Sequence, residues 1–251
     1  MQSSPVEKFD IHSYKLERDA LLHARFRKVV DALKMILDAG NLLSIPSSFG
    51  KDSSLTLTAA LTAHVECMAN PNSPVTKETP FIVVHVDTLV ETVVMAMYSA
   101  YAMKALREYC QEQGINLELH HVTPPLHEQF ASLFIGARKL PSTPSLNADC
   151  SVIWKVSGSE NVQKQLIKKY GVNRIVSCLG SRDDESSSRA ASITKFDNRI
   201  SVETLLERNS SGINTFAPIV DWSTSDVFDC LLRAGEQASI VPAAGFEIPA
   251  F

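Results

Sequence analysis

The chain has 251 residues, of which 45% are hydrophobic, and its net charge is −4. A chain of this size can bury a substantial core, and its slight acidity argues against autonomous binding to nucleic acid through phosphate neutralisation. The polar, mixed-charge start does not resemble a signal peptide and no apolar run is long enough to span a bilayer, so we expect a cytoplasmic protein without a membrane partner.

Apolar residues at helical spacing predict a first helix over residues 15–39, which Gly40 ends. A short apolar strand over 42–45 follows. In chain order, the remaining expected elements are helix 53–69, strand 81–86, helix 90–113, strand 115–122, helix 126–137, helix 160–170, strand 174–179, a short apolar piece at 216–220 and a helix from Ser223 to about 234.

Strands that alternate with helices predict an α/β fold, with a doubly wound, mostly parallel sheet and helices on both faces. Ligands of such sheets bind at the carboxyl ends of the strands. We divide the chain into a helical extension (1–40), a nucleotide-binding domain (41–235) and a C-terminal tail (236–251) that we expect to be truncated. Residues 181–215 are rich in Ser, Asp, Asn and Arg and are expected to be mostly loop.

The loop between the first predicted strand and the next helix is suited to binding phosphate. It contains Ser47, Ser48, Phe49, Gly50, Lys51, Asp52 and Ser53. The free N–H groups and the dipole at a helix N-terminus attract anions, Gly50 allows close backbone approach, and Lys51 can neutralise charge. It is not a Walker A loop, because the first glycine is missing and Asp52 replaces Ser or Thr. The alternative is a surface turn that caps a helix.

The loop resembles the PP-loop, S-G-G-K-D-S, of ATP pyrophosphatases, with Phe49 in place of the first glycine. The resemblance implies an adenine-nucleotide α-hydrolase-like (HUP-type) fold and cleavage of ATP to AMP and pyrophosphate, which activates a substrate oxygen as an adenylate. It makes Lys51 and Asp52 catalytic and the whole loop nucleotide-binding, with the bulky Phe49 pointing away from the phosphates. Mg²⁺ would arrive with ATP, its water shell held by Asp52 or Asp87.

Further segments resemble motifs of the phosphoadenylylsulfate (PAPS) reductase branch, and together they cover about residues 40–235. Asp87 and Thr88, followed by Glu91, match a V-D-T segment that lies by the nucleotide. The alternative for them is a polar turn that caps a helix.

After the strand that ends at Leu179, the chain is similar to the family's G-x-R-x-x-E-S-x-x-R. The matching residues are Gly180, Arg182, Glu185, Ser186 and Arg189. This implies that Gly180, Arg182 and Arg189 bind the nucleotide and that Arg182 is catalytic, since an arginine fork suits phosphate oxygens. A solvated mixed-charge loop is the alternative.

Residues 217–223 resemble the family's P-I-x-D-W-[ST] turn. We expect this turn to be structural: Trp222 packs, and Ser223 caps the last helix in a capping box with Asp226.

Cys150 begins the segment C-S-V-I-W-K, where relatives carry a cysteine that handles sulfur or binds an iron–sulfur cluster. The resemblance therefore implies a catalytic Cys150, whereas the plain interpretation is a loop thiol. The five cysteines are scattered and form no CxxC pair, so they give a [4Fe–4S] cluster little support. Four are expected to be buried thiols: Cys67, Cys110 and Cys230 in helices and Cys178 in a strand. His120 and His121 are expected to be strand-end histidines, with no protein metal site.

The combined motifs look most like the ATP-pyrophosphatase component of DNA phosphorothioation systems, the DndC and SspD type. That resemblance implies a DNA backbone phosphate as the acceptor, presented by a partner, and a cysteine desulfurase as the sulfur donor. No E-C-G-[IL]-H segment is present, which disfavours a self-contained reductase. The alternatives are a sulfonucleotide reductase that uses an external thiol, a tRNA-thiolating or amide-forming PP-loop enzyme, and a non-catalytic nucleotide-sensing subunit.

Overall fold

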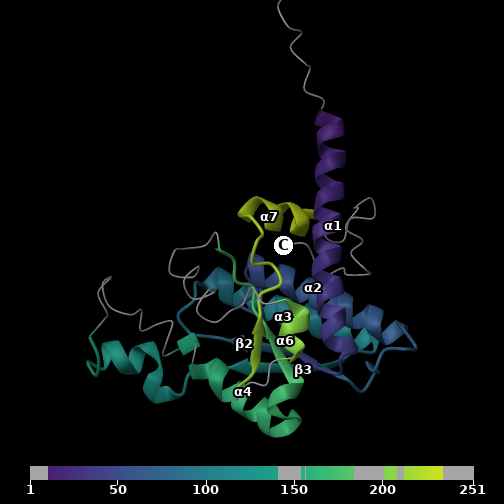
Figure 1. Ribbon diagram of the computed structural model, residues 1–251. Coiled ribbons are helices and arrows are strands. Elements are labelled where there is room, and N and C mark those ends of the chain that lie inside the picture. Colours follow the sequence, from purple (N-terminus) through teal and green to yellow (C-terminus); the bar gives the residue numbers. More distant parts are fainter. Residues whose placement is uncertain (1–10, 141–153, 156, 184–200, 208–211, 234–251) are drawn as a thin grey trace, which may run out of the picture.

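The computed structural model describes residues 11–140, 154–155, 157–183, 201–207 and 212–233 (Figure 1). Its centre is a five-stranded sheet in the order β3-β2-β1-β4-β5, in which every neighbouring pair is parallel. The strands are β1 (Leu42–Pro46), β2 (Pro80–Val86), β3 (Asn116–Val122), β4 (Ile175–Cys178) and β5 (Asn214–Phe216). This confirms the predicted α/β fold with a parallel sheet.

Helices cover both faces of the sheet. They are α1 (Ile11–Asp38), α2 (Lys51–Ala69), α3 (Val93–Gln113), α4 (Ser157–Tyr170), α6 (Val202–Glu207) and α7 (Thr224–Arg233). One face packs against α1, α2 and α3 in the larger core, which α6 and α7 also join, and the other face packs against α4 through Val162 and Leu166. Because both faces are covered, the inner strands are buried along nearly their whole length and read as continuous apolar runs.

The long helix α1 shares its core with the sheet. Phe26, Val30 and Leu33 on α1 are almost fully buried in the same cluster as strand residues such as Ile45 and Val83. Figure 1 shows α1 rising along one side of the molecule, with α7 beside its upper half. Residues on both sides of the predicted boundary at residue 40 therefore pack into one hydrophobic core. Within the described part of the chain, no helix is both long and apolar enough to cross a bilayer.

One expectation for the secondary structure was wrong. The helix predicted over 126–137 is instead a 3-10 turn (Leu126–Glu128) followed by a π turn (Ala131–Ile135), because the backbone of Gln129 between them is extended. Its apolar residues form no buried stripe, since Leu126 and Ile135 are more than 70% exposed. In the segment expected to be loop, α6 forms because Val202 and Leu205, three residues apart, are buried against the core.

His64 is a buried imidazole in the middle of α2. It is fully buried, with its ring 5.3 Å from that of Phe81, and neither ring nitrogen has a hydrogen-bond partner among the described residues. Burial lowers the pKa of His64 from 6.5 to about 4, because the low-dielectric core disfavours the charged form.

We predict that His64 makes the fold sensitive to acid. Since the folded-state pKa lies below the unfolded value, the stabilisation is complete above pH 6.5 and is lost as the pH falls towards 4. Between these limits the free energy of unfolding of the wild type should fall by about 3 kcal/mol more than that of His64→Leu. Urea denaturation of both proteins at several pH values measures this difference, and parallel stability profiles would contradict it.

Candidate functional site

The carboxyl ends of β1 and β4 form the crevice in which open α/β sheets bind ligands. From β1 the chain continues to β2 on one side, whereas β4 and β5 lie on the other, so the strand order reverses between β1 and β4. The loop 47–50 follows β1, and Gly180 to Arg182 follow β4. The structure thus brings these two predicted motifs together at the switch point, and the third, Asp87 and Thr88, follows the adjacent β2.

The N-terminus of α2 has backbone donors that face no intrahelical partner. Gly50 is the N-cap, with φ −74° and ψ 169°, and no side chain in the described structure caps the helix there. Ser54 donates the first helical bond, to the carbonyl of Gly50 at 2.8 Å, so the N–H groups of Lys51, Asp52 and Ser53 precede the hydrogen-bond ladder. Together with the helix dipole, these groups make an anion site.

Phe49 adopts a left-handed conformation that turns its side chain into the core. Its φ is +57°, its side chain is 3% exposed, and its ring lies 5.1 Å from the ring of His85. The Phe49 N–H donates to Ser47 Oγ at 3.1 Å, which holds the turn. The bulky ring at this position therefore lies beneath the loop, away from the backbone donors of α2.

His85 supports the loop from β2 and was not found by sequence reasoning. Its Nδ1 donates to the carbonyl of Ser47 at 2.8 Å, and its ring stacks on that of His121 at 5.5 Å. Burial lowers the pKa of His85, which keeps the ring neutral. A histidine inside the apolar run FIVVHV was the available signal. His121 Nε2 in turn lies 3.7 Å from Asp87 Oδ2, and His120 pairs with Glu118, so both histidines have protein partners.

Asp52 is bound by two cations from different parts of the chain. Its Oδ1 accepts a hydrogen bond of 2.6 Å from Arg182 Nε, and its Oδ2 one of 2.7 Å from Lys51 Nζ. Arg182 is 1% exposed and also donates to the carbonyl of Trp222 at 3.2 Å. Lys51 and Arg182 thus bring two positive groups to the first turn of α2 at the switch point.

Gly180 allows β4 to approach α2 closely. A Cβ at this position would lie 2.9 Å from the backbone carbon and oxygen of Asp52 and 2.9 Å from the nitrogen of Ser53. These are backbone atoms that cannot move aside without displacing the start of α2. The close packing of the residues after β4 against the start of α2 therefore explains why position 180 is a glycine.

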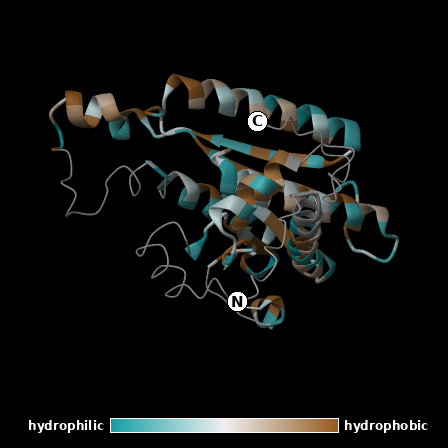
Figure 2. Ribbon diagram, turned by 90° about the horizontal axis from the view of Figure 1, so that it is seen from above, coloured by the Kyte–Doolittle hydropathy of each residue, from teal (hydrophilic) through white to brown (hydrophobic). Residues whose placement is uncertain are grey.

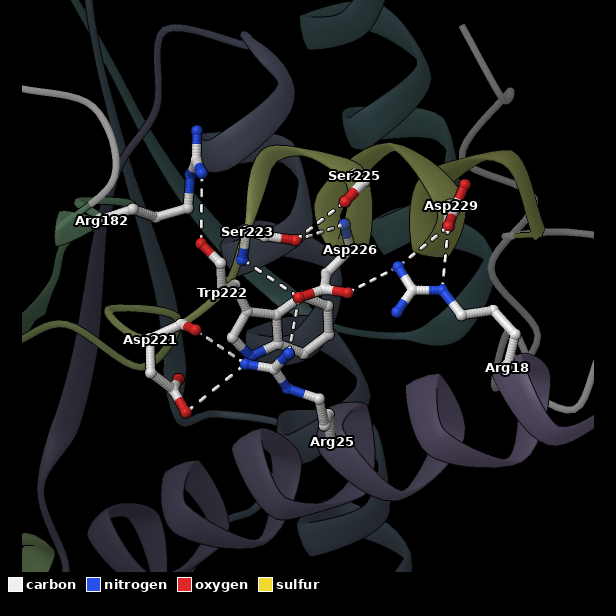
Figure 3. A network of polar contacts seen from close by, with 9 residues as sticks. All are labelled: Arg18, Arg25, Arg182, Asp221, Trp222, Ser223, Ser225, Asp226 and Asp229. Carbon is white, nitrogen blue, oxygen red and sulfur yellow. Dashed lines mark hydrogen bonds and ion pairs between the residues drawn. The ribbon is translucent and has the colours of Figure 1, made fainter.

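The turn 217–223, in which the carbonyl of Trp222 accepts a hydrogen bond from Arg182, is held against α1 (Figure 3). Ser223 and Asp226 form the predicted capping box, each side chain accepting the other's N–H at 3.1 Å. Arg18 and Arg25 from α1 both pair with Asp226, and Arg25 also lies 5.1 Å above the ring of Trp222. Burial alone would raise the pKa of Asp226, but its hydrogen bonds with Ser223 and Arg18 lower it.

The remaining predicted residues lie along the rim after β2 or outside the described residues. Thr88 is buried and donates to Glu91 at 3.3 Å, and Glu91 lies 3.7 Å from Lys155. Asp87 accepts the N–H of Leu89 at 2.9 Å and keeps 28% of its side chain exposed. Cys150 and Arg189 lie outside the described residues.

The described cysteines do not fit an iron–sulfur cluster. Cys67, Cys110, Cys178 and Cys230 are all buried, and no group of three metal-ligating side chains occurs in the described ranges. Burial raises the pKa of Cys67 to about 11 and that of Cys110 to about 12, which opposes the thiolate that a cluster requires. The predicted placement of these four as buried thiols is confirmed.

Solved structures similar to this chain have low sequence identity to it. The U34-tRNA thiolase NcsA from Methanococcus maripaludis, solved with its [4Fe–4S] cluster, is 16% identical with a TM-score of 0.48, covering 85% of this chain and 64% of its own. PAPS reductase from Candida auris in a phosphate complex is 14% identical, with a TM-score of 0.42 and 84% of both chains covered. FMN adenylyltransferase from Candida glabrata, with FMN and the ATP analogue AMPCPP, is 12% identical with a TM-score of 0.42, covering 84% of this chain and 58% of its own.

The chain thus spans less than two thirds of the thiolase and of the adenylyltransferase. No curated protein matches it significantly. The model of the phosphoadenosine phosphosulfate reductase domain matches residues 43–247, which run from the second residue of β1 to beyond the end of α7. The chain therefore belongs to the phosphoadenosine phosphosulfate reductase domain family.

Proposed function

We propose that this protein is an ATP pyrophosphatase that cleaves ATP to AMP and pyrophosphate and transfers the adenylyl group to an acceptor oxygen. The observation that carries the proposal is the start of α2, where the unpaired N–H groups of residues 51–53, Lys51 and the buried Arg182 meet at the switch point. Charge at that point favours a polyphosphate.

The chemical task of the protein is electrostatic. Cleavage at the α phosphate leaves negative charge on pyrophosphate, and fixed donors aimed at that charge stabilise the transition state. Lys51 is 31% exposed at its side chain and is held by Asp52, so its ammonium can turn to a phosphate oxygen with little movement. Asp87, whose carboxylate is partly exposed, would hold the water shell of an Mg²⁺ bound to ATP, because two cations already occupy Asp52.

Arg182 is proposed as a positioning residue in place of the phosphate clamp that the motif suggested. A guanidinium that is 1% exposed and bound to Asp52 and Trp222 acts on the nucleotide through the loop that it holds. Its charge still adds to the field at the N-terminus of α2, because a buried charge is poorly screened.

The acceptor that we propose is a DNA backbone phosphate, in a phosphorothioation reaction with a cysteine desulfurase as sulfur donor. Support comes from the joint resemblance of the five motifs to the DndC and SspD type. The net charge of −4 fits DNA that is presented by a partner in the complex. The terminal sulfur of a persulfide, on the desulfurase or on Cys150, would then attack the adenylylated phosphorus and release AMP. A second thiol would cleave the S–S bond, which leaves sulfur on the phosphate and a disulfide as the other product.

Incubation of the purified protein with α-labelled ATP and Mg²⁺ tests the proposal. The reaction is run alone, with DNA and a cysteine desulfurase, and with tRNA in place of DNA. AMP and pyrophosphate are the expected products, with stimulation by DNA. Formation of ADP overturns the pyrophosphatase, stimulation by tRNA alone overturns the DNA acceptor, and bound ATP without turnover in any mixture indicates a nucleotide sensor.

We predict that Lys51→Ala lowers the rate of AMP formation by roughly 100-fold, because it removes a positive charge that stabilises the departing pyrophosphate. Lys77→Ala, which changes an exposed lysine in the turn before β2, is the matched control and should keep the wild-type rate. Equal rates in both variants would exclude Lys51 from the reaction.

A double-mutant cycle tests whether Arg182 and Asp52 act as one unit. Arg182→Met should lower the free energy of unfolding by about 3 kcal/mol, because it leaves a buried carboxylate with one partner fewer. Asp52→Asn is the second single variant. The loss in the free energy of unfolding of the double variant should be smaller than the sum of the two single losses by at least about 1 kcal/mol. The exposed pair Lys104–Glu108 on α3 should show coupling below about 0.5 kcal/mol. Additive losses at Arg182 and Asp52 would refute the coupling.

Gly180→Ala should weaken the binding of a non-hydrolysable ATP analogue by at least about tenfold, which equals about 1.4 kcal/mol. The new methyl group would press on the backbone of Asp52 and Ser53 and shift the donors at the start of α2. Gly212→Ala is the control, because a Cβ there meets nothing within 4 Å. Calorimetric titration measures both, and equal affinities would show that the loop absorbs the added group.

A further inference from the structure

The segment 89–97, which includes the first turn of α3, is mostly apolar and exposed. All residues from 89 to 97 are exposed, and seven of these nine are apolar. Val93, Val94 and Met97 are 74%, 75% and 70% exposed. Figure 2 shows hydrophobic colour over this half of α3 and hydrophilic colour towards its C-terminal end. A helix that is hydrophobic all round is normally buried, and exposed apolar patches of this extent mark interaction sites.

The second half of the same helix shows what a normal solvent face looks like here. Ala102, Met103 and Leu106 face the core and are buried, while Lys104 and Glu108 face solvent and pair with each other at 3.7 Å. Continued towards the N-terminus, the solvent face becomes Tyr101, Met97 and Val94, which are 53%, 70% and 75% exposed, and Val90, which is 43% exposed, lies just before the helix. The surplus of apolar side chains is therefore on the face that points away from the core.

The spacing and charge of this stripe favour another helix as its occupant. Val94, Met97 and Tyr101 on α3 follow steps of three and four residues, which is the spacing of a coiled-coil seam, and Val90 lies just before the helix. No charged residue occurs between Glu91 and Lys104. Nucleic acid is disfavoured on this stripe, because binding to its phosphates requires Lys or Arg.

We propose that a second copy of this chain covers the stripe, with the two α3 helices antiparallel and the two-fold axis beside Met97. In that register Val94 of one copy faces Tyr101 of the other, and the segment before α3 that carries Glu91 runs beside Lys104. The patch is then complementary to itself, as a two-fold interface requires: apolar residues meet at the centre and opposite charges meet at both ends. No lysine or arginine faces its own counterpart across the axis.

The exposed area is adequate for such a pair. Leu89, Val90, Val93, Val94, Met95, Met97 and Tyr101 are each between 37% and 75% exposed. Together they offer several hundred Å² per copy, on the order of the ~800 Å² that each partner contributes to a standard stable interface. The helix begins five residues after Thr88, so the interface would lie near the site at the carboxyl end of β2. The proposal is independent of the reaction that the site performs.

Sedimentation equilibrium of the full chain tests the proposal. The wild type should be a dimer at about 10 µM, and Met97→Lys, which sets two like charges beside the axis, should raise the dimer dissociation constant by roughly 100-fold. Ala96→Lys puts the same charge on another exposed face of the same turn and should stay dimeric. Circular dichroism melting checks that both variants fold. A wild type that is monomeric at about 100 µM, or a Met97→Lys variant that remains dimeric, overturns the proposal.

Cross-linking tests the register. Met97→Cys lies beside the proposed axis and should give a covalent dimer with a short bis-maleimide. Arg107→Cys lies on the same outward side of α3 but should not, because the rise of 1.5 Å per residue separates its two copies by about 28 Å. Efficient cross-linking of Arg107→Cys, or none of Met97→Cys in a dimeric protein, would exclude the antiparallel pairing.

Discussion

The buried contact between Arg182 and Asp52 fixes the geometry of the whole site. It joins the carboxyl end of β4 to the first turn of α2, two elements that lie 130 residues apart in the chain. A buried guanidinium is tolerated only when its donors are satisfied, so Asp52 and the carbonyl of Trp222 must both be in place. Gly180 must then lack a side chain, since β4 and α2 leave no room for one. The ties from α1 to Asp226 hold the turn that carries Trp222.

The same contact explains how the loop can bind an anion without being rebuilt. Lys51 and Arg182 share one carboxylate, and only Lys51 is solvent-accessible. When a phosphate arrives, the lysine can change partner while the arginine continues to hold Asp52. The backbone donors at the start of α2 therefore keep their positions. Donors that need no reorganisation are worth most in catalysis, because no free energy is spent on orienting them during the reaction.

Local sequence signals predicted the parts of this structure that local interactions determine. The strands, the loop before α2 and the capping box of Ser223 and Asp226 follow from periodicity, glycine placement and cap residues. The burial of Arg182 and the support of Ser47 by His85 depend on contacts between distant segments, which no local pattern encodes. The helix predicted over 126–137 failed because apolar spacing alone does not show whether a core is there to receive it.

Phe49 is the clearest departure from the glycine-rich loop, and its geometry bears on whether the protein is an enzyme or a sensor. A left-handed φ costs a non-glycine residue about 1 kcal/mol or more, whereas burial of a phenyl ring contributes about 2 kcal/mol. The strain is thus offset by packing against His85. Because the ring is directed into the core, the N–H groups of α2 stay available for phosphate. Bulk at position 49 therefore gives no reason to regard the loop as non-catalytic.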